Sequence, residues 1–353
     1  MRIRIVIFFL LISVYTNSQT LGGNTVFNFL NFSNTPQLTA LGGINISQTS
    51  NDVGLVFNNP ALLRPAMHTQ LNAVFNSFYA GINIYHLSLG YRNEKLNTNF
   101  SWGLNYFNYG IIQQTDASGN VLGTLKPADW VMQLSASHSY MDKWNYGATF
   151  KFINSNYGQY RANGVAMDAG ILYVDSARLF SASVVAKNMG FQLRKYAGTN
   201  AQDIPFDLEI GITKRLQNAP LGFSITAHHI HQFDIRYNDT AFNNDNGFLN
   251  SSSKKISFDK IFRHLIFAAM GYVGDKIELT VGYNYLRRQE LGFGNSGNGV
   301  NGFSLGVGVI LHKMQIRYGR AYYQNNTAYN QLGLNLKLNE YFGLGKFGKN
   351  IGW

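Results

Sequence analysis

Apolar and polar residues alternate one by one along most of this chain. The run 276–285 is the clearest case, with apolar side chains on one face and Lys, Glu, Thr, Gly and Asn on the other. The apolar positions are Ile277, Leu279, Val281, Tyr283 and Tyr285. A period of two is the pattern of a β-strand. Aromatic residues beside Leu and Val on the apolar face are typical of a barrel wall that faces lipid.

Segments with this alternation recur often enough to predict a closed sheet. We expect strands near 70–78, 82–92, 98–112, 129–140, 144–155, 164–174, 178–188, 205–216, 220–232, 261–273, 276–288, 300–311, 313–323 and 329–339. Their number is even, and about ten residues is the length that a tilted strand needs to cross a bilayer. We therefore predict an all-β fold, a 14-stranded antiparallel transmembrane β-barrel over 69–340, followed by a tail at 341–353. Between Ile84 and Tyr85 the alternation slips, which predicts a β-bulge or a different strand boundary.

The connections between these strands give a second indication. Short turns are expected at 140–143, 175–178, 217–220, 273–276 and 312, and long loops at 113–128, 156–163, 189–204, 233–260 and 289–299. Long and short connections alternate, as in an outer-membrane barrel with short periplasmic turns and long outer loops. A Greek-key sandwich does not predict this alternation.

Composition favours the same fold class. Only 13% of the residues are charged, whereas 45% are hydrophobic and 14% are aromatic. A soluble domain usually has about 25% charged residues. A large soluble β-sandwich is the alternative that composition leaves open.

The first residues predict export. Arg2 and Arg4 precede the apolar run 5–12, and small residues lead to a cleavage site after Ser18, so 1–18 is expected to be a signal peptide. The apolar run is far shorter than the ~20 residues of a membrane-spanning helix. With 0 cysteines, the chain offers no lipid-acylation site, disulfide or thiolate metal ligand.

Net charge indicates the kind of neighbour. The formal charge is +11, and removal of Arg2 and Arg4 would leave +9. A basic exported protein suggests anionic neighbours such as lipopolysaccharide, whereas no dense Lys/Arg run suggests nucleic acid. We expect no cofactor, and a lipid or lipopolysaccharide is the bound molecule that this setting suggests.

Residues 19–68 do not have the pattern of a barrel wall. They contain two Gly-Gly pairs, three prolines and short apolar runs, a composition that breaks strands and marks turns. We predict an N-terminal plug inside or beneath the barrel. A disordered lead is the alternative, but the segment is too apolar for comfortable disorder.

The N-terminal segment resembles the plug signature of the FadL-like outer-membrane transport superfamily. The matching positions are Ala40, Gly42, Gly43, Asp52, Phe57, Asn59, Pro60 and Ala61. In that superfamily a Gly-rich turn, an Asp and an aromatic-Asn-Pro-Ala element form the plug of a fourteen-stranded barrel. Glycine lets backbone pack against the wall, and Asn before Pro turns the chain.

The run 22–43, continued through 59–63, is similar to the start of the PorQ family, outer-membrane components of the type IX secretion system of Bacteroidota. This resemblance implies an anchor in the attachment complex at the cell surface, which holds the sortase PorU and its partner PorZ, with the related barrel PorV in the same complex. The alternatives are a PorV-like cargo shuttle and a FadL-like channel for hydrophobic solutes.

Candidate chemistry is sparse. His228, His229 and His231 form the densest histidine group, but strand alternation places His228 on the opposite face from the other two, so we predict no metal site. His86 with Ser88, and His138 with its neighbouring serines, lie two apart on strands without a third group, so no catalytic residue and no enzyme is predicted.

The loop 233–260 is the candidate partner-binding surface. Aromatic anchors among mobile polar residues suit protein binding. The residues in question are Phe242, Phe248, Leu249, Lys254, Lys255 and Phe258. A solvated loop whose aromatic residues only touch other loops is the alternative.

Overall fold

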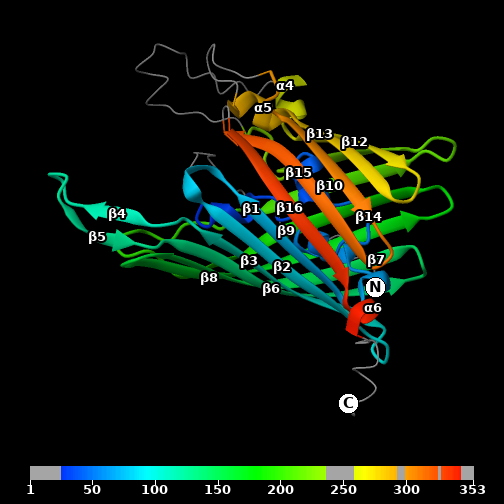
Figure 1. Cartoon of the computed structure of the whole chain (residues 1–353), viewed down its shortest axis with the longest axis horizontal. Coiled ribbons are helices and arrows are strands. Elements are labelled where there is room, and N and C mark those ends of the chain that lie inside the picture. The colour runs from blue at the N-terminus through cyan, green and yellow to red at the C-terminus, as the bar shows by residue number, and fades with distance from the viewer. Residues whose placement is uncertain (1–24, 236–257, 292–298, 325–326, 343–353) are drawn as a thin grey trace, which may run out of the picture.

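In the computed structural model, which describes residues 25–235, 258–291, 299–324 and 327–342, fourteen strands close into one antiparallel barrel (Figure 1). The barrel strands are β1 (Gln70–Ser77), β2 (Asn83–Asn93), β3 (Thr98–Asn108), β6 (Ala128–Tyr140), β7 (Trp144–Tyr157), β8 (Tyr160–Asp175), β9 (Phe180–Arg194), β10 (Asp207–Arg215), β11 (Leu221–Ala227), β12 (Leu265–Val273), β13 (Ile277–Asn284), β14 (Phe303–Ile310), β15 (Met314–Gln324) and β16 (Thr327–Lys337). Each pairs with its neighbours along the chain, and β1 pairs with β16 to close the ring. This confirms the predicted fourteen-stranded barrel.

Several predicted boundaries were wrong for identifiable reasons. The ladder of β7 and β8 continues to the pair Tyr157 and Tyr160, so the long loop expected at 156–163 is a tight turn. Strand β11 ends at Ala227, well before 232, and β13 ends at Asn284, where helix α5 (Tyr285–Leu291) begins. The slip after Ile84, expected to be a β-bulge or a different strand boundary, is neither, because β2 keeps an unbroken register with both neighbours and Ile84 is a buried inward residue.

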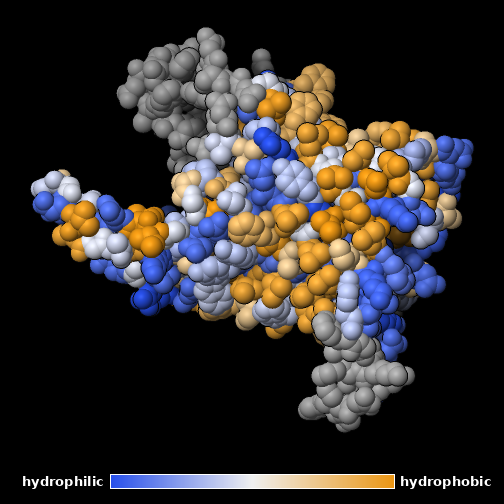
Figure 2. Space-filling model, in the orientation of Figure 1, coloured by the Kyte–Doolittle hydropathy of each residue, from blue (hydrophilic) through white to orange (hydrophobic). Residues whose placement is uncertain are grey.

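The two faces of the wall differ sharply in character. The outward positions of β13 are exposed and apolar, whereas Glu278, Thr280 and Asn284 on the inward side are buried. The same division holds in β7, where Trp144, Tyr146 and Phe150 face outward. Figure 2 shows apolar residues gathered over the barrel wall and hydrophilic residues bordering them. The outside of the barrel is therefore apolar and its inside is polar.

The N-terminal segment, residues 25–68, lies inside the barrel (blue in Figure 1). Its elements are η1 (Asn28–Asn31), α2 (Pro36–Ala40), η2 (Val53–Phe57), η3 (Pro60–Leu62) and η4 (Pro65–Met67). Helix α2 contacts β13 to β16, η2 contacts β1 to β3, and η3 contacts β6 to β8. A short segment that reaches strands on opposite sides of a closed wall occupies the interior.

The longer connections gather at one end of the barrel. They carry η5 (Tyr79–Gly81), the hairpin of β4 (Ile112–Thr115) and β5 (Val121–Leu125), and helices α4 (Phe258–Arg263) and α5. The hairpin extends away from the barrel, and α4 lies beside α5 (Figure 1). Helix α6 (Leu338–Phe342) follows the last strand at the opposite end.

Among the described residues, no helix has both the length and the apolar character of a membrane-spanning helix.

Candidate functional site: the filled interior and its polar cavity

The motif residues of the N-terminal segment begin its short helices. The Asp52 carboxylate accepts a hydrogen bond from the backbone N–H of Gly54 (2.8 Å), and the Asn59 side chain accepts one from Ala61 (2.9 Å). Both are N-cap contacts, and Pro60 follows Asn59 at a position that needs no N–H donor. The Asn59 amide also donates to Ser183 Oγ on β9 (2.9 Å). The Asn-Pro-Ala element thus starts a helix and fastens it to the wall.

Gly42 and Gly43 end helix α2 in a conformation that favours glycine. Their φ angles are 96° and 97°, in the left-handed region where other residues are strained. A side chain at Gly42 would also collide with Ile266 of β12, and one at Gly43 would lie 2.5 Å from the Arg287 guanidinium. This turn therefore requires two glycines for both backbone and space.

Wall glycines meet the backbone of the N-terminal segment directly. A methyl group at Gly147 of β7 would lie 2.6 Å from the carbonyl carbon of Pro60 and 2.8 Å from the nitrogen of Ala61. At Gly282 of β13 it would collide with Gly42 and Ala40, and at Gly319 of β15 with Pro36. We call these contacts, at Gly147, Gly282 and Gly319, the glycine seam. No side chain can fit between segment and wall there.

Polar side chains of the wall satisfy the segment's backbone carbonyls. Hydrogen bonds run from Ser304 Oγ to the Ala40 carbonyl (2.9 Å), from Ser137 Oγ to Leu63 (2.6 Å) and from Ser181 Oγ to Ser47 (2.7 Å). A buried carbonyl without a partner is costly, so an irregular segment inside a barrel needs such donors. The Ser-rich and Asn-rich inner face supplies them.

Three buried ion pairs lie on the inner wall. Lys151 Nζ and Asp168 Oδ2 are 2.6 Å apart, Lys187 Nζ and Glu209 Oε1 are 3.2 Å apart, and Arg317 Nη1 and Glu278 Oε2 are 3.0 Å apart. These pairs are Lys151–Asp168, Lys187–Glu209 and Arg317–Glu278. Each unites a cation and a carboxylate from different strands, as a buried charge requires.

All three pairs also contact the N-terminal segment. Lys187 donates to Asn58 Oδ1 (2.5 Å), and the Lys151 ammonium lies 5.2 Å from the centre of the Phe57 ring. Asp52 Oδ2 lies 3.9 Å from Arg317 Nε. Burial raises the pKa of Asp52 above its usual value, although the Arg317 charge acts in the opposite direction.

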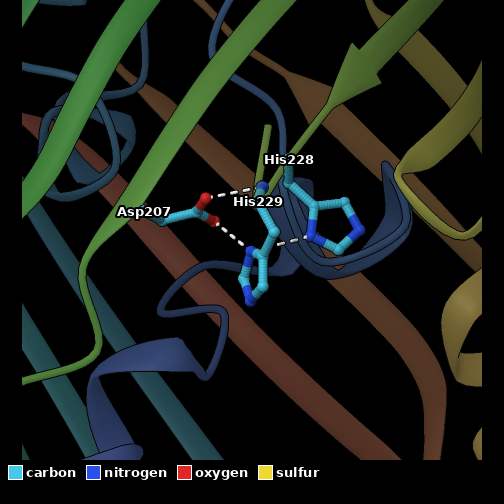
Figure 3. A group of neighbouring side chains, drawn as sticks. All are labelled: Asp207, His228 and His229. Atoms are coloured by element: carbon cyan, nitrogen blue, oxygen red, sulfur yellow. Dashed lines mark hydrogen bonds and ion pairs between the residues drawn. The ribbon is translucent and has the colours of Figure 1, made fainter. Parts of the chain in front are cut away.

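His228 and His229 converge with Asp207 at the long-loop end (Figure 3). His229 Nδ1 lies 2.8 Å from Asp207 Oδ2 and 3.1 Å from His228 Nδ1, and the His229 backbone N–H donates to Asp207 Oδ1 (2.6 Å). The alternation argument that separated His228 from His229 was wrong, because β11 ends at Ala227 and His229 adopts a left-handed φ of 54°. His231 instead packs on Phe206.

Electrostatics distinguishes the two histidines. Burial, reinforced by the neighbouring His229, lowers the pKa of His228 to about 3. At His229 burial also acts to lower the pKa, but the hydrogen bond and charge of Asp207 outweigh it and raise the pKa above the usual value. His228 is therefore neutral over the physiological range, and His229 is the imidazole that attracts a proton.

This group borders a cavity of about 260 Å³ between the wall, the segment and α5. Its polar lining includes Lys187, Asp207, Glu209, His228, His229 and Arg287. Apolar side chains contribute as well, among them Phe32, Leu38 and Leu286. The cavity is therefore lined by both apolar and ionisable side chains.

The candidate partner-binding loop lies mostly outside the described residues. This holds for Phe242, Phe248, Leu249, Lys254 and Lys255. Phe258, the first residue of α4, is described, and its side chain is 83% exposed. Elsewhere at this end, the hairpin exposes Ile112, Val121 and Leu122.

Sequence reasoning missed the inner ion pairs. Asp168 and Glu278 were expected to face the lumen singly. The cation that pairs with Asp168 is Lys151 on the adjacent strand β7, and the cation that pairs with Glu278 is Arg317 on β15, two strands away. A search for opposite charges on inward positions would have suggested them. The partner of each could not be assigned without the register of the sheet.

Comparisons with known proteins concern the fold. No protein-family model and no curated protein matches the chain. The CymD monoaromatic hydrocarbon channel is similar in structure, with a TM-score of 0.47 and 12% identity over 88% of this chain and 97% of that one. A Pseudomonas aeruginosa FadL homologue has a TM-score of 0.44 and 11% identity over 86% of this chain and 98% of that one.

Proposed function

We propose that this chain is an integral outer-membrane barrel, closed by its N-terminal segment, that anchors a protein complex at the cell surface as PorQ-like proteins do. In this role it holds PorZ and PorU, with PorV in the same complex, and has no catalytic activity of its own. The N-terminal segment acts as the plug.

The membrane location is supported by the division between the two faces of the wall. Exposed outward positions such as Leu134, Phe150 and Leu305 would cost free energy in water and are stable in lipid. Inward positions carry Ser, Asn, Gln and charged groups. A closed sheet leaves no unpaired strand edge, which is the condition for β-structure in a bilayer.

The glycine seam is the observation that carries the closed-barrel part of the proposal. The backbone of the segment contacts glycines of β7, β13 and β15, and serines of the wall donate hydrogen bonds to its carbonyl groups. A segment held in this way has little freedom to swing aside for a solute. The interior therefore suits a rigid scaffold that presents loops.

The anchor role itself is supported by the resemblance of the run 22–43 to the PorQ start and by the apolar side chains exposed at the long-loop end. In helix α4, Phe258 is 83% exposed and Ile261 is 41% exposed. Such residues outside the lipid-facing wall are suited to contact with a partner protein.

The competing function is a FadL-like channel for hydrophobic solutes, and a PorV-like shuttle is a further alternative. A channel needs a continuous apolar route through the barrel. Buried ion pairs at Lys151, Lys187 and Arg317 interrupt such a route on three parts of the wall. This favours the anchor over the channel.

The first experiment is gentle detergent extraction of the tagged full-length protein, followed by mass spectrometry of what co-purifies. We expect PorZ, PorU and PorV to be recovered, and no ion conductance when the protein is placed in planar bilayers. Recovery of the barrel alone, with tight binding of fatty acid, would contradict the anchor and support the channel.

A pair of deletions then tests the docking surface. Removal of 236–257 is expected to abolish recovery of PorZ, whereas removal of 113–124, the hairpin at the same end, serves as the matched control and leaves it intact. Heat-modifiable migration on gels checks that both variants form barrels. Unchanged recovery after removal of 236–257 would exclude that loop as the docking surface.

A further inference from the structure

We infer that Asp207, His228 and His229 form a binding site for a divalent transition metal, of which Zn²⁺ is the reference ion. The inference does not depend on the proposed anchor function. Their candidate ligand atoms all lie within 4.8 Å of one another. Two imidazoles and a carboxylate are a common zinc ligand set, with the fourth position left for water or another ligand.

Two of the three distances between the ligand atoms are close to those around a coordinated ion. Tetrahedral Zn²⁺ with nitrogen ligands at about 2.0–2.1 Å places its donor atoms about 3.3 Å apart. Here His228 Nδ1 and His229 Nδ1 are separated by 3.1 Å, and His229 Nδ1 and Asp207 Oδ2 by 2.8 Å. At these two contacts an ion would require the atoms to move apart by only a few tenths of an ångström.

Protons alone do not satisfy this cluster. The single proton on His229 Nδ1 can point squarely at Asp207 or at His228, but not at both. The other close contact is then left without a well-aligned hydrogen. His228 is 2% exposed, and its other ring nitrogen, Nε2, has no hydrogen-bond partner among the described residues. A cation between the three atoms would accept all three lone pairs at once.

The backbone holds the ligands in place. The left-handed φ of 54° at His229 turns its ring back toward His228, which an extended strand would not do. The His229 N–H bonds to Asp207 Oδ1 and leaves Oδ2 free to bind the ion. Paired hydrogen bonds fix His228 to His264, from His228 N to the His264 carbonyl (3.0 Å) and between His264 Nδ1 and the His228 carbonyl (2.8 Å). Such supporting contacts are what orient the ligands of metal sites.

The surroundings leave room and charge for an ion. All three residues line the cavity, whose volume of about 260 Å³ can hold several waters. The neighbouring Glu209 is paired with Lys187, so Asp207 remains to provide a local negative charge. A metal here would join β10 to the residues that follow β11.

The test is metal titration of the purified full-length protein after chelator treatment. Isothermal titration with Zn²⁺ is expected to show one tight site per chain, and Co²⁺ to give the ligand-field absorption of a tetrahedral nitrogen-bound ion. His228→Gln with His229→Gln should weaken binding at least about 10-fold. His231→Gln, which alters a histidine 6.0 Å from the His229 ring, is the matched control and should bind normally.

Two results would overturn the site. One is the absence of both a stoichiometric Zn²⁺ isotherm and a Co²⁺ spectrum in the unaltered protein, which needs no variant to fold. The other is equal Zn²⁺ affinity in the double variant and the His231→Gln control.

Discussion

Two regions of the barrel interior hold the N-terminal segment in different ways. At the glycine seam, backbone meets backbone, and no side chain separates segment from wall. Around the cavity, long charged side chains reach between strands, and space remains between them. One region is filled by the main chain and the other is spanned by ion pairs.

The two regions differ in which substitutions they can tolerate. Backbone contacts at van der Waals distance tolerate almost no added volume, since interiors are close-packed. Buried ion pairs tolerate shape changes but not the loss of one partner, because the remaining charge cannot be solvated. Each region should therefore respond to a different kind of substitution.

The largest effect is expected at Lys151, which is paired with Asp168 on the neighbouring strand β8. Lys151→Met leaves a carboxylate that is fully buried without its cation, which should lower the free energy of unfolding by about 3–5 kcal/mol. Urea unfolding in detergent, followed by tryptophan fluorescence, measures the loss. The double variant with Asp168→Asn should recover much of it, because no charge is then stranded. A double variant as unstable as Lys151→Met alone would show that the ion pair is not the cause.

A smaller effect is expected at the glycine seam. Gly147→Ala places a methyl group 2.6 Å from the Pro60 carbonyl carbon, and the backbone must shift to admit it. The expected cost is about 1–3 kcal/mol, with faster proteolysis of the N-terminal segment. Gly271→Ala is the matched control, because nothing lies within 4 Å of a methyl group at that position of β12. Equal stability of the two variants would mean that the segment does not need the close contact.

The same contrast explains what the sequence could predict. Period-two alternation predicted the barrel and the inward positions of β13, because side chains along a strand alternate between its two faces. It could not identify which inward charges pair, since Lys151 and Asp168 meet only through the register of β7 against β8. The local sequence pattern determines which face of the sheet a side chain lies on, whereas its ion-pair partner depends on the register between strands.

The histidine group shows the other limit. Alternation was extended past Ala227, where the strand ends, so His229 was assigned to the face opposite His228. The left-handed backbone conformation of His229 depends on tertiary contacts, and the hydrophobic pattern of the sequence does not predict it. The roles of the motif residues Asp52 and Asn59 depend only on local structure. Each is an N-cap residue whose side chain accepts a hydrogen bond from the backbone N–H two positions ahead.

The smallest effect is expected at Asp52, which begins η2 and lies 3.9 Å from Arg317 Nε. Because burial raises the pKa of this carboxyl group in the folded protein, folding favours its protonated form. Its contribution to stability is then present below the unfolded pKa of about 3.9 and is lost as the pH rises through the folded pKa. Asp52→Asn keeps an oxygen that accepts the Gly54 N–H and leaves Arg317 paired with Glu278. At neutral pH we expect it to change the free energy of unfolding by less than about 1 kcal/mol, in either direction.

The pH profile separates this explanation from a simple change of net charge. Stability of the unaltered protein, measured by urea unfolding from pH 4 to pH 7, should fall relative to that of Asp52→Asn as the pH rises. Asp116→Asn removes one carboxylate from the exposed turn of the β4–β5 hairpin and is the matched control, with a profile parallel to the unaltered protein. If Asp52→Asn instead cost more than about 2 kcal/mol at pH 7, the ionised carboxylate would be stabilising the segment, and its ion pair with Arg317 would be what fixes η2 in the barrel.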